Sequence, residues 1–443
     1  MPPADDQLVW LRKQEPEDFA TLVARLTQVE RACLSQQWRL FGRAEQLPPP
    51  GDWRTWLICA GRGFGKTRAG AEWVRAVTRD DAAARVALVA ASIGEARSVM
   101  VEGESGILAI SPPDHRPHFE PSLKRLTWPN GAQAFLYSAS EPEALRGPQH
   151  SHAWCDEIAK WELAGDRAMR AWDNLLLGLR LGRDMRVLAT TTPRAVPVLR
   201  RLLAEEQAGA AVVTRGSTRD NADHLPASFL REMTRAFGDT ALGRQELDGV
   251  LLEDLEGALW SRALLERCRG AVDAPPVRVV VGVDPPASAA GDACGIVVCA
   301  LLADGSGRVL ADASVERASP ERWARGVADA AAAWGADRVV AEANQGGAMV
   351  ASVLRAADIA LPVRLVHASR GKVARAEPVA ALYEAGRVTH AGLFPRLEDE
   401  LCGLLAGGSY AGPGRSPDRA DALVWALSEL MLRSAREPRV RVF

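Results

Sequence analysis

The chain has 443 residues, of which 47% are hydrophobic and 25% charged, and its formal net charge at pH 7 is −2. This length predicts two domains, because a single hydrophobic core rarely organises so long a chain. The composition is that of an ordinary globular protein. It lacks the basic excess of many nucleic-acid-binding proteins, so bulk charge neither supports nor excludes that class.

No apolar run approaches the length of a membrane span, and the acidic start of the chain lacks the basic and apolar regions of a signal peptide. The seven cysteines are scattered, without a Cys-x-x-Cys pair. This usage is typical of a reducing cytoplasm and argues against a disulfide framework or a structural zinc site. We therefore expect a cytoplasmic protein with no membrane partner.

The first half of the chain predicts an α/β domain. Residues 1–45 read as polar helix, and the proline-rich segment 47–52 ends it. Strands and helices then alternate to about residue 213, the pattern of a parallel sheet. The expected strands are residues 56–60, 86–90, 134–138, 152–155, 186–190 and 211–214.

Residues 60–67 read AGRGFGKT and lie between the first expected strand and an expected helix at residues 68–77. A strand, a glycine-rich turn, a Lys-Thr pair and a helix predict a phosphate-binding P-loop. Lys66 would contact the β- and γ-phosphates, and the Thr67 hydroxyl would bind Mg²⁺. Ala60 stands where the motif usually has its first glycine. The simpler alternative is a glycine-rich turn with a stray lysine.

An acidic pair, Asp156 and Glu157, follows the expected strand 152–155. In an ATPase such a pair holds Mg²⁺ and polarises the attacking water, whereas in other proteins it is usually a solvated turn. The strand 186–190 then runs into threonines at 190–192, whose hydroxyls could sense a γ-phosphate or simply suit a strand end. Arg146, in a flexible loop, is a candidate arginine finger or plain surface charge.

A composition shift near residue 260 marks the expected domain boundary, between the acidic segment 253–257 and the prolines at 275–276. The second half predicts three consecutive antiparallel strands, then helix, strand, helix, strand, and a final helix. The expected elements are strands 278–284, 295–302, 308–315 and 338–341, and helices 320–334 and 419–432.

In this second half, three carboxylates lie at the ends of expected strands or at the start of an expected helix. Asp284 ends the first strand, Glu342 follows the fourth, and Asp421 begins the last helix. If the first and fourth strands are neighbours, as in an RNase H-like sheet, these groups meet and can hold two Mg²⁺ or Mn²⁺ ions for phosphodiester cleavage. Asp418 and Asp292 are candidate additional ligands, although any one carboxylate alone is usually a solubilising residue.

Together these motifs resemble the large terminase subunit of tailed phages. The resemblance covers about residues 40–435 and also rests on the segments 44–49, 145–147, 257–261 and 416–422. It implies a P-loop (RecA/ASCE-like) ATPase domain at residues 1–260, followed by an RNase H-like nuclease domain at residues 261–443. It implies ATP-driven translocation of double-stranded DNA into a procapsid, and endonucleolytic cutting of that DNA.

The resemblance also implies cofactors and partners. ATP and Mg²⁺ would serve the first domain, and Mg²⁺ or Mn²⁺ the second. The partners would be double-stranded DNA, a portal protein, a small terminase subunit and further copies in a ring, commonly a pentamer. The protein would act in the bacterial cytoplasm, transiently attached to the procapsid portal. The Ala- and Arg-rich composition suggests a high-GC host, so a prophage or a gene transfer agent is as good a source as a free phage.

Residue by residue, the resemblance makes Gln46 an adenine contact, Arg146 a finger acting on the neighbouring subunit, and residues 190–192 a coupling segment. The remaining roles implied are nucleotide contacts by Arg62, Gly63, Gly65, Lys66 and Thr67, magnesium binding by Thr67 and Asp156, catalysis by Glu157, and nuclease metal binding by Asp284, Glu342 and Asp421.

A local basic stretch at residues 364–375 is a candidate DNA-binding face. The rival interpretation is a cellular DNA-remodelling or repair ATPase whose C-terminal domain only binds DNA. A helicase of that kind needs a second RecA-like domain, and residues 276–443 show spaced acids instead of a second ATPase pattern. A non-catalytic capsid scaffold would explain neither set of site residues.

Overall fold

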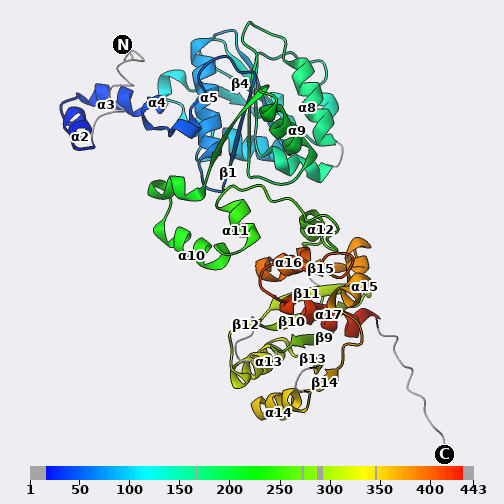
Figure 1. Ribbon diagram of the computed structural model, residues 1–443. Coiled ribbons are helices and arrows are strands. Elements are labelled where there is room, and N and C mark those ends of the chain that lie inside the picture. The colour runs from blue at the N-terminus through cyan, green and yellow to red at the C-terminus, as the bar shows by residue number, and fades with distance from the viewer. Residues whose placement is uncertain (1–15, 165–166, 271–273, 287–292, 345–346, 433–443) are drawn as a thin grey trace, which may run out of the picture. The chain divides into compact units, whose positions relative to one another are not determined.

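The computed structural model describes residues 16–164, 167–270, 274–286, 293–344 and 347–432. It divides into two compact units, Met1–Leu252 and Glu253–Phe443, each built around one β-sheet (Figure 1). The domain boundary expected near residue 260 stays a prediction. Among the described residues, no helix is both long enough and apolar enough to span a membrane.

The sheet of the first unit has eight strands in the order β3-β4-β5-β2-β6-β7-β1-β8. The six neighbouring strands β5, β2, β6, β7, β1 and β8 are parallel, as the alternation of strands and helices predicted. Strands β3 and β4 extend the sheet beyond β5 and are antiparallel. The strands are β1 Thr55–Ala60, β2 Arg85–Ala90, β3 His118–Glu120, β4 Arg125–Thr127, β5 Gln133–Ser138, β6 His152–Cys155, β7 Arg186–Thr191 and β8 Ala211–Gly216.

Helices cover both faces of this sheet. Helix α5 packs on one face, whereas α8 and α9 pack on the other. Each face has its own hydrophobic cluster. The helices of this unit are α2 Pro16–Ala24, α3 Gln28–Ser35, α4 Trp38–Phe41, α5 Lys66–Asp80, α6 Ile93–Glu95, α7 Ile107–Ile110, α8 Arg167–Gly178, α9 Pro197–Gln207, α10 Ala227–Phe237 and α11 Ala241–Glu246.

A glycine brings α5 unusually close to the sheet. A Cβ atom placed on Gly70 would lie 2.1 Å from the indole ring of Trp154 on β6. Trp154 is fully buried, so the ring has no room to move away. The helix that begins at the P-loop therefore rests directly on the strand that leads to Asp156.

The sheet of the second unit has the strand order β14-β13-β9-β10-β11-β15, with β12 paired to β10. The strands β9, β10 and β11 are antiparallel, and β13 lies parallel to β9 as its neighbour. This confirms the expected RNase H-like arrangement. The strands are β9 Pro276–Asp284, β10 Ala293–Leu302, β11 Gly307–Asp312, β12 Val315–Glu316, β13 Arg338–Glu342, β14 Val363–Val366 and β15 Val388–His390.

Helices α13 and α14 pack on one face of this sheet, and α15, α16 and α17 pack on the other. Helix α13 has strong end signals, with Pro320 in its first turn and Gly335 in the left-handed conformation (φ 58°) after its end. The helices are α12 Arg262–Arg267, α13 Pro320–Trp334, α14 Gly347–Ala357, α15 Lys372–Glu384, α16 Pro395–Cys402 and α17 Asp418–Leu427.

Two glycines let α17 approach the sheet backbone. A Cβ atom on Gly282 of β9 would lie 1.9 Å from the carbonyl oxygen of Ala422, and one on Gly295 of β10 would lie 1.9 Å from that of Asp418. No other residue type fits at either place without moving the helix. This contact sets how close α17 comes to the ends of the strands.

Candidate active sites

The P-loop joins the end of β1 to the start of α5 and lines a cavity of about 1200 Å³. Gly63 and Gly65 have left-handed backbone angles, φ 75° and 93°, which only glycine adopts readily. Ala60 is the last residue of β1, in regular strand conformation. A strand accepts alanine without strain, so the departure from the usual motif does not disturb the loop.

Lys66 lies inside the loop, and only 6% of it is exposed. Its ammonium group donates to the carbonyl oxygens of Ala60 and Gly61, at 2.8 and 3.0 Å, and to the Thr192 hydroxyl at 3.0 Å. It also lies 3.7 Å from the Glu157 carboxylate. The lysine thus touches the loop, the threonine run and the acidic pair at once.

The acidic pair Asp156 and Glu157 directly follows strand β6, which has the bounds that the sequence predicted. The Thr190 hydroxyl donates to Asp156 Oδ1 at 2.6 Å, and the Thr192 amide donates to Glu157 Oε2 at 3.2 Å. These contacts exist because β6 and β7 are parallel neighbours, so their carboxyl ends meet at one edge of the sheet. Glu157 has φ 48°, a left-handed conformation that costs a non-glycine residue about 1 kcal/mol.

Electrostatics distinguish Asp156 from ordinary surface acids. Burial raises its pKa to about 6, and the charge of Glu157 adds to the shift, whereas the hydrogen bond from Thr190 and the charge of Lys66 oppose it. Burial therefore favours the protonated form of Asp156, whereas a cation bound beside it would favour the ionised form.

Gln46 and Arg62 both line the cavity. Gln46 is buried, and its amide nitrogen donates to the carbonyl oxygens of Phe64 and Gly65 at 3.1 and 3.4 Å. Arg62 is mostly exposed, and its guanidinium lies 3.5 Å from Glu246. The structure therefore gives Gln46 a contact with the P-loop backbone, and leaves Arg62 at the mouth of the cavity.

Arg146 does not line this cavity. Its side chain is 79% exposed, and its guanidinium lies 3.9 Å from Glu143. The structure of one chain thus does not bring Arg146 to the P-loop. Sequence reasoning missed Arg194, which lines the cavity two residues after Thr192 and lies 3.9 Å from Glu246. Its position directly after the threonine run was the signal that could have found it.

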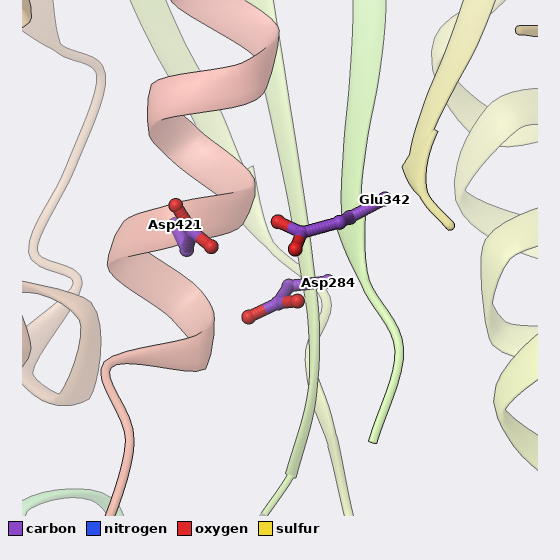
Figure 2. Close-up of side chains that lie close together, drawn as sticks. All are labelled: Asp284, Glu342 and Asp421. Carbon is purple, nitrogen blue, oxygen red and sulfur yellow. The ribbon is translucent and has the colours of Figure 1, made fainter. Parts of the chain in front are cut away.

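In the second unit, Asp284, Glu342 and Asp421 come together (Figure 2). Asp284 ends β9, Glu342 ends the parallel neighbour β13, and Asp421 lies in the first turn of α17. One carboxylate oxygen from each lies within 4.8 Å of the others. Figure 2 shows the helical carboxylate facing the two strand carboxylates across a short gap.

The crowding of these acids shifts their protonation. Burial and then the charge of Asp421 raise the pKa of Asp284 well above its ordinary value. The same two causes raise the pKa of Glu342, more weakly because it is less buried. Like charges held this close favour either a proton or a cation between them.

Asp418 lies at the edge of this cluster. Its carboxylate accepts from the Ala293 amide at 3.4 Å and lies 3.4 Å from the Lys372 ammonium. It is not one of the three acids that meet. Asp292, the other candidate ligand, lies outside the described residues.

Two cations inside the cluster were missed as site residues. Lys372 lies 2.6 Å from Asp284, and Arg375 lies 2.6 Å from Asp421 and 3.1 Å from Glu342. The sequence suggested residues 364–375 as a DNA-binding face, but Arg364 is paired with Glu429 at 2.6 Å and these two cations face carboxylates. The spacing of three residues between Lys372 and Arg375, which puts them on one face of a helix, was the available signal.

Two protein-family models match the chain. A model described as terminase large subunit, T4likevirus-type, N-terminal matches residues 57–267, and a model described as terminase RNaseH-like domain matches residues 281–430. Together they cover most of the chain: the first match lies mainly in the first unit and extends past Leu252, and the second lies within the second unit. Among curated proteins, none matches the chain.

Solved structures to which the chain is similar include three phage proteins. The large terminase of the thermophilic bacteriophage D6E in complex with ADP is 11% identical, with 90% of this chain and 98% of that chain covered and a TM-score of 0.41. The HK97 bacteriophage large terminase is 15% identical, with 91% and 95% covered and a TM-score of 0.37. The large terminase nuclease of phage G20c is 19% identical, with 39% and 98% covered and a TM-score of 0.30.

Proposed function

Given that the chain belongs to the terminase large-subunit family, we propose a division of labour between its two units in DNA packaging. The protein is an ATPase and a nuclease of the packaging machinery. The first unit would bind and hydrolyse ATP to move DNA, and the second would cut it. The RNase H-like sheet of the second unit disfavours a helicase or repair translocase, which would carry a second RecA-like unit there.

We assign the nucleotide site from the P-loop outward. Lys66 would contact the β- and γ-phosphates, and the backbone of Gly63 and Gly65 would cradle them. Thr67 and Asp156 supply hard oxygen donors next to that position, which fits Mg²⁺. Glu157 would orient the attacking water. The proximity of Lys66, Asp156 and Glu157 at one sheet edge supports this assignment.

We assign the threonine run to coupling. The Lys66 ammonium donates a hydrogen bond to Thr192, and the Thr190 hydroxyl donates one to Asp156. A phosphate that binds the Lys66 ammonium would therefore break or distort the hydrogen bond between Lys66 and Thr192. Gln46 would move with the loop, because its amide nitrogen donates to the carbonyl oxygens of Phe64 and Gly65. To bond to an adenine base through that nitrogen, it would have to give up one of these two hydrogen bonds. Arg62, exposed at the cavity mouth, would close on the bound phosphates.

We propose that Arg146 completes the nucleotide site of a neighbouring copy in a ring, commonly a pentamer in this family. The exposure of Arg146 and its distance from its own cavity support action on another subunit. The further partners we propose are double-stranded DNA, a portal protein and a small terminase subunit, with the protein in the bacterial cytoplasm and transiently on the portal. A free phage, a prophage and a gene transfer agent stay equal candidates for its source.

We assign the nuclease site to Asp284, Glu342 and Asp421, with Asp418 as an outer ligand and Asp292 as a further candidate. Three clustered carboxylates supply only oxygen donors, and this donor set fits Mg²⁺ or Mn²⁺ better than zinc. The chemistry such ions supply is the activation of a water and the stabilisation of the leaving oxygen. Asp284, Glu342 and Asp421 would each supply a carboxylate oxygen to these ions.

The observation that carries this proposal is the presence of two separate acidic sites in two separate units. The test measures ATP hydrolysis and Mn²⁺-dependent plasmid cleavage on the same preparations. Lys66→Ala should lose ATP hydrolysis by about 100-fold or more, since a phosphate contact is removed, and should keep cleavage. Asp284→Ala should do the reverse. Equal loss of both activities in a folded variant would contradict the two-site assignment.

A further inference from the structure

Two positive side chains project from the start of α15 into the carboxylate cluster of the second unit. The Lys372 ammonium lies 2.6 Å from Asp284, 3.4 Å from Asp418 and 3.5 Å from Asp421. The Arg375 guanidinium contacts both Asp421 and Glu342. Every acid of the cluster therefore has one of these two cations as a direct partner.

Packing holds both cations in place. The Arg375 guanidinium lies 4.7 Å from the ring centre of Trp425 on α17, and the indole N–H of Trp425 donates to Glu342 at 2.9 Å. The Lys372 ammonium donates to the Ser416 hydroxyl at 2.8 Å. The Lys372 ammonium thus has the Ser416 hydroxyl and three carboxylates around it, and these partners hold its positive charge at the cluster.

The stability of helix α15 does not explain why two positive side chains lie near its start. Lys372 and Arg375 stand in and next to the first turn of α15, where the helix dipole presents its positive end. A positive side chain there is unfavourable for the helix itself. The carboxylates offset that cost, so the position of the cations is explained by the cluster.

The charge count shows what the cations do. When ionised, the four acids Asp284, Glu342, Asp418 and Asp421 carry four negative charges, and Lys372 and Arg375 return two positive ones. The cluster is then held together without a metal but stays net negative, which repels a DNA phosphate. A divalent ion would draw on carboxylate oxygens that these cations already contact, among them Asp284 Oδ2 and both oxygens of Asp421.

We propose that Lys372 and Arg375 are resident counter-ions of the nuclease site, which preorganise its carboxylates and compete with divalent metal for them. They are positioning residues that act through the acids. Metal loading then requires at least one of them to withdraw, so the site stays inactive until divalent ions displace its own cations. This inference rests on the metal-binding role proposed above for the cluster.

The experiment titrates Mn²⁺ alone into the full-length protein by calorimetry, without nucleotide or DNA. Lys372→Met should bind Mn²⁺ about tenfold more tightly than the wild type, because a competing charge worth ~1.4 kcal/mol is gone. In EDTA the same variant should unfold at a lower temperature, since Asp284 and Asp418 lose their cationic partner and only Arg375 still offsets the repulsion among the carboxylates. Lys372→Arg should restore both values. Arg370→Met removes a positive charge from an exposed side chain nearby and should leave both unchanged.

Arg375→Met provides the same test if Lys372→Met does not fold, as judged by circular dichroism. Unchanged or weaker Mn²⁺ binding in a folded Lys372→Met or Arg375→Met variant would overturn the inference. Asp421→Asn separates this outcome from a failure of the metal site itself. If Asp421→Asn binds Mn²⁺ as the wild type does, the metal assignment is wrong. If it binds weakly while the cation variants are unchanged, only the counter-ion role is wrong.

Discussion

At the scale of single residues, Asp156 carries a folding cost that the metal-binding role proposed for it would explain. It is buried, and its pKa is raised to about 6, so the folded protein holds a proton there more tightly than the unfolded chain. Ionising Asp156 therefore costs folding free energy above about pH 6, and this cost is absent below its ordinary pKa of 3.8.

We accordingly predict that Asp156→Asn stabilises the protein while it abolishes ATP hydrolysis. The free energy of unfolding at pH 7.5 should rise by about 1–3 kcal/mol, because an amide keeps the hydrogen bond from Thr190 without the buried charge. The gain should shrink as the pH falls from about 6 toward 3.8. Urea denaturation in EDTA across this range measures it, and a gain independent of pH would contradict the explanation.

The acids of the second unit should differ in importance. Asp284→Asn and Asp421→Asn should reduce plasmid cleavage by about 100-fold or more, since both groups belong to the cluster that meets. Asp418→Asn should reduce plasmid cleavage by only about tenfold, because Asp418 contacts the Ala293 amide and Lys372 at the edge of the cluster and would act by orienting the other groups. ATP hydrolysis by each variant serves as the folding control. The reverse order would mean that Asp418 binds metal directly and Asp421 does not.

At the scale of elements, the sequence was sufficient to predict the site residues that lie at the ends of strands. The carboxylates Asp284 and Glu342 could be placed because each closes an apolar strand, and strand order then brings them together. The two short strands β3 and β4 were missed because three residues give too little alternation to read. Lys372 and Arg375 were missed as site residues because only the packing of α15 against α17 brings them to the acids.

The approach of α17 to the sheet yields a prediction for Gly295. Gly295→Ala should push the start of α17 outward, because the new methyl group would meet the Asp418 carbonyl oxygen. The expected cost is about 1–3 kcal/mol of stability, with reduced plasmid cleavage because Asp421 moves with the helix. Gly392→Ala is the matched control, since a Cβ atom there meets nothing within 4 Å. Thermal melting and cleavage assays check both, and full cleavage by Gly295→Ala would show that α17 tolerates the shift.

At the scale of the whole molecule, the exposure of Arg146 predicts activity shared between copies. Lys66→Ala and Arg146→Ala proteins should each be inactive as ATPases, but their mixture should regain activity. In a randomly mixed ring, about a quarter of the interfaces pair an intact loop with an intact finger. A coupled ATPase assay across mixing ratios, with assembly checked by light scattering, measures this. Assembled mixtures without any recovery would indicate that Arg146 does not act in trans.

The contact between Gly70 of α5 and Trp154 of β6 also constrains how this protein can evolve. A side chain at position 70 and an indole at position 154 cannot coexist, because the methyl carbon would lie 2.1 Å from the ring. Homologues with a larger residue at position 70 should therefore have a smaller one at position 154, and neither position should drift alone. Through this pair, homologues should inherit the spacing between helix α5, which begins at the P-loop, and strand β6, which leads to Asp156, as a single trait.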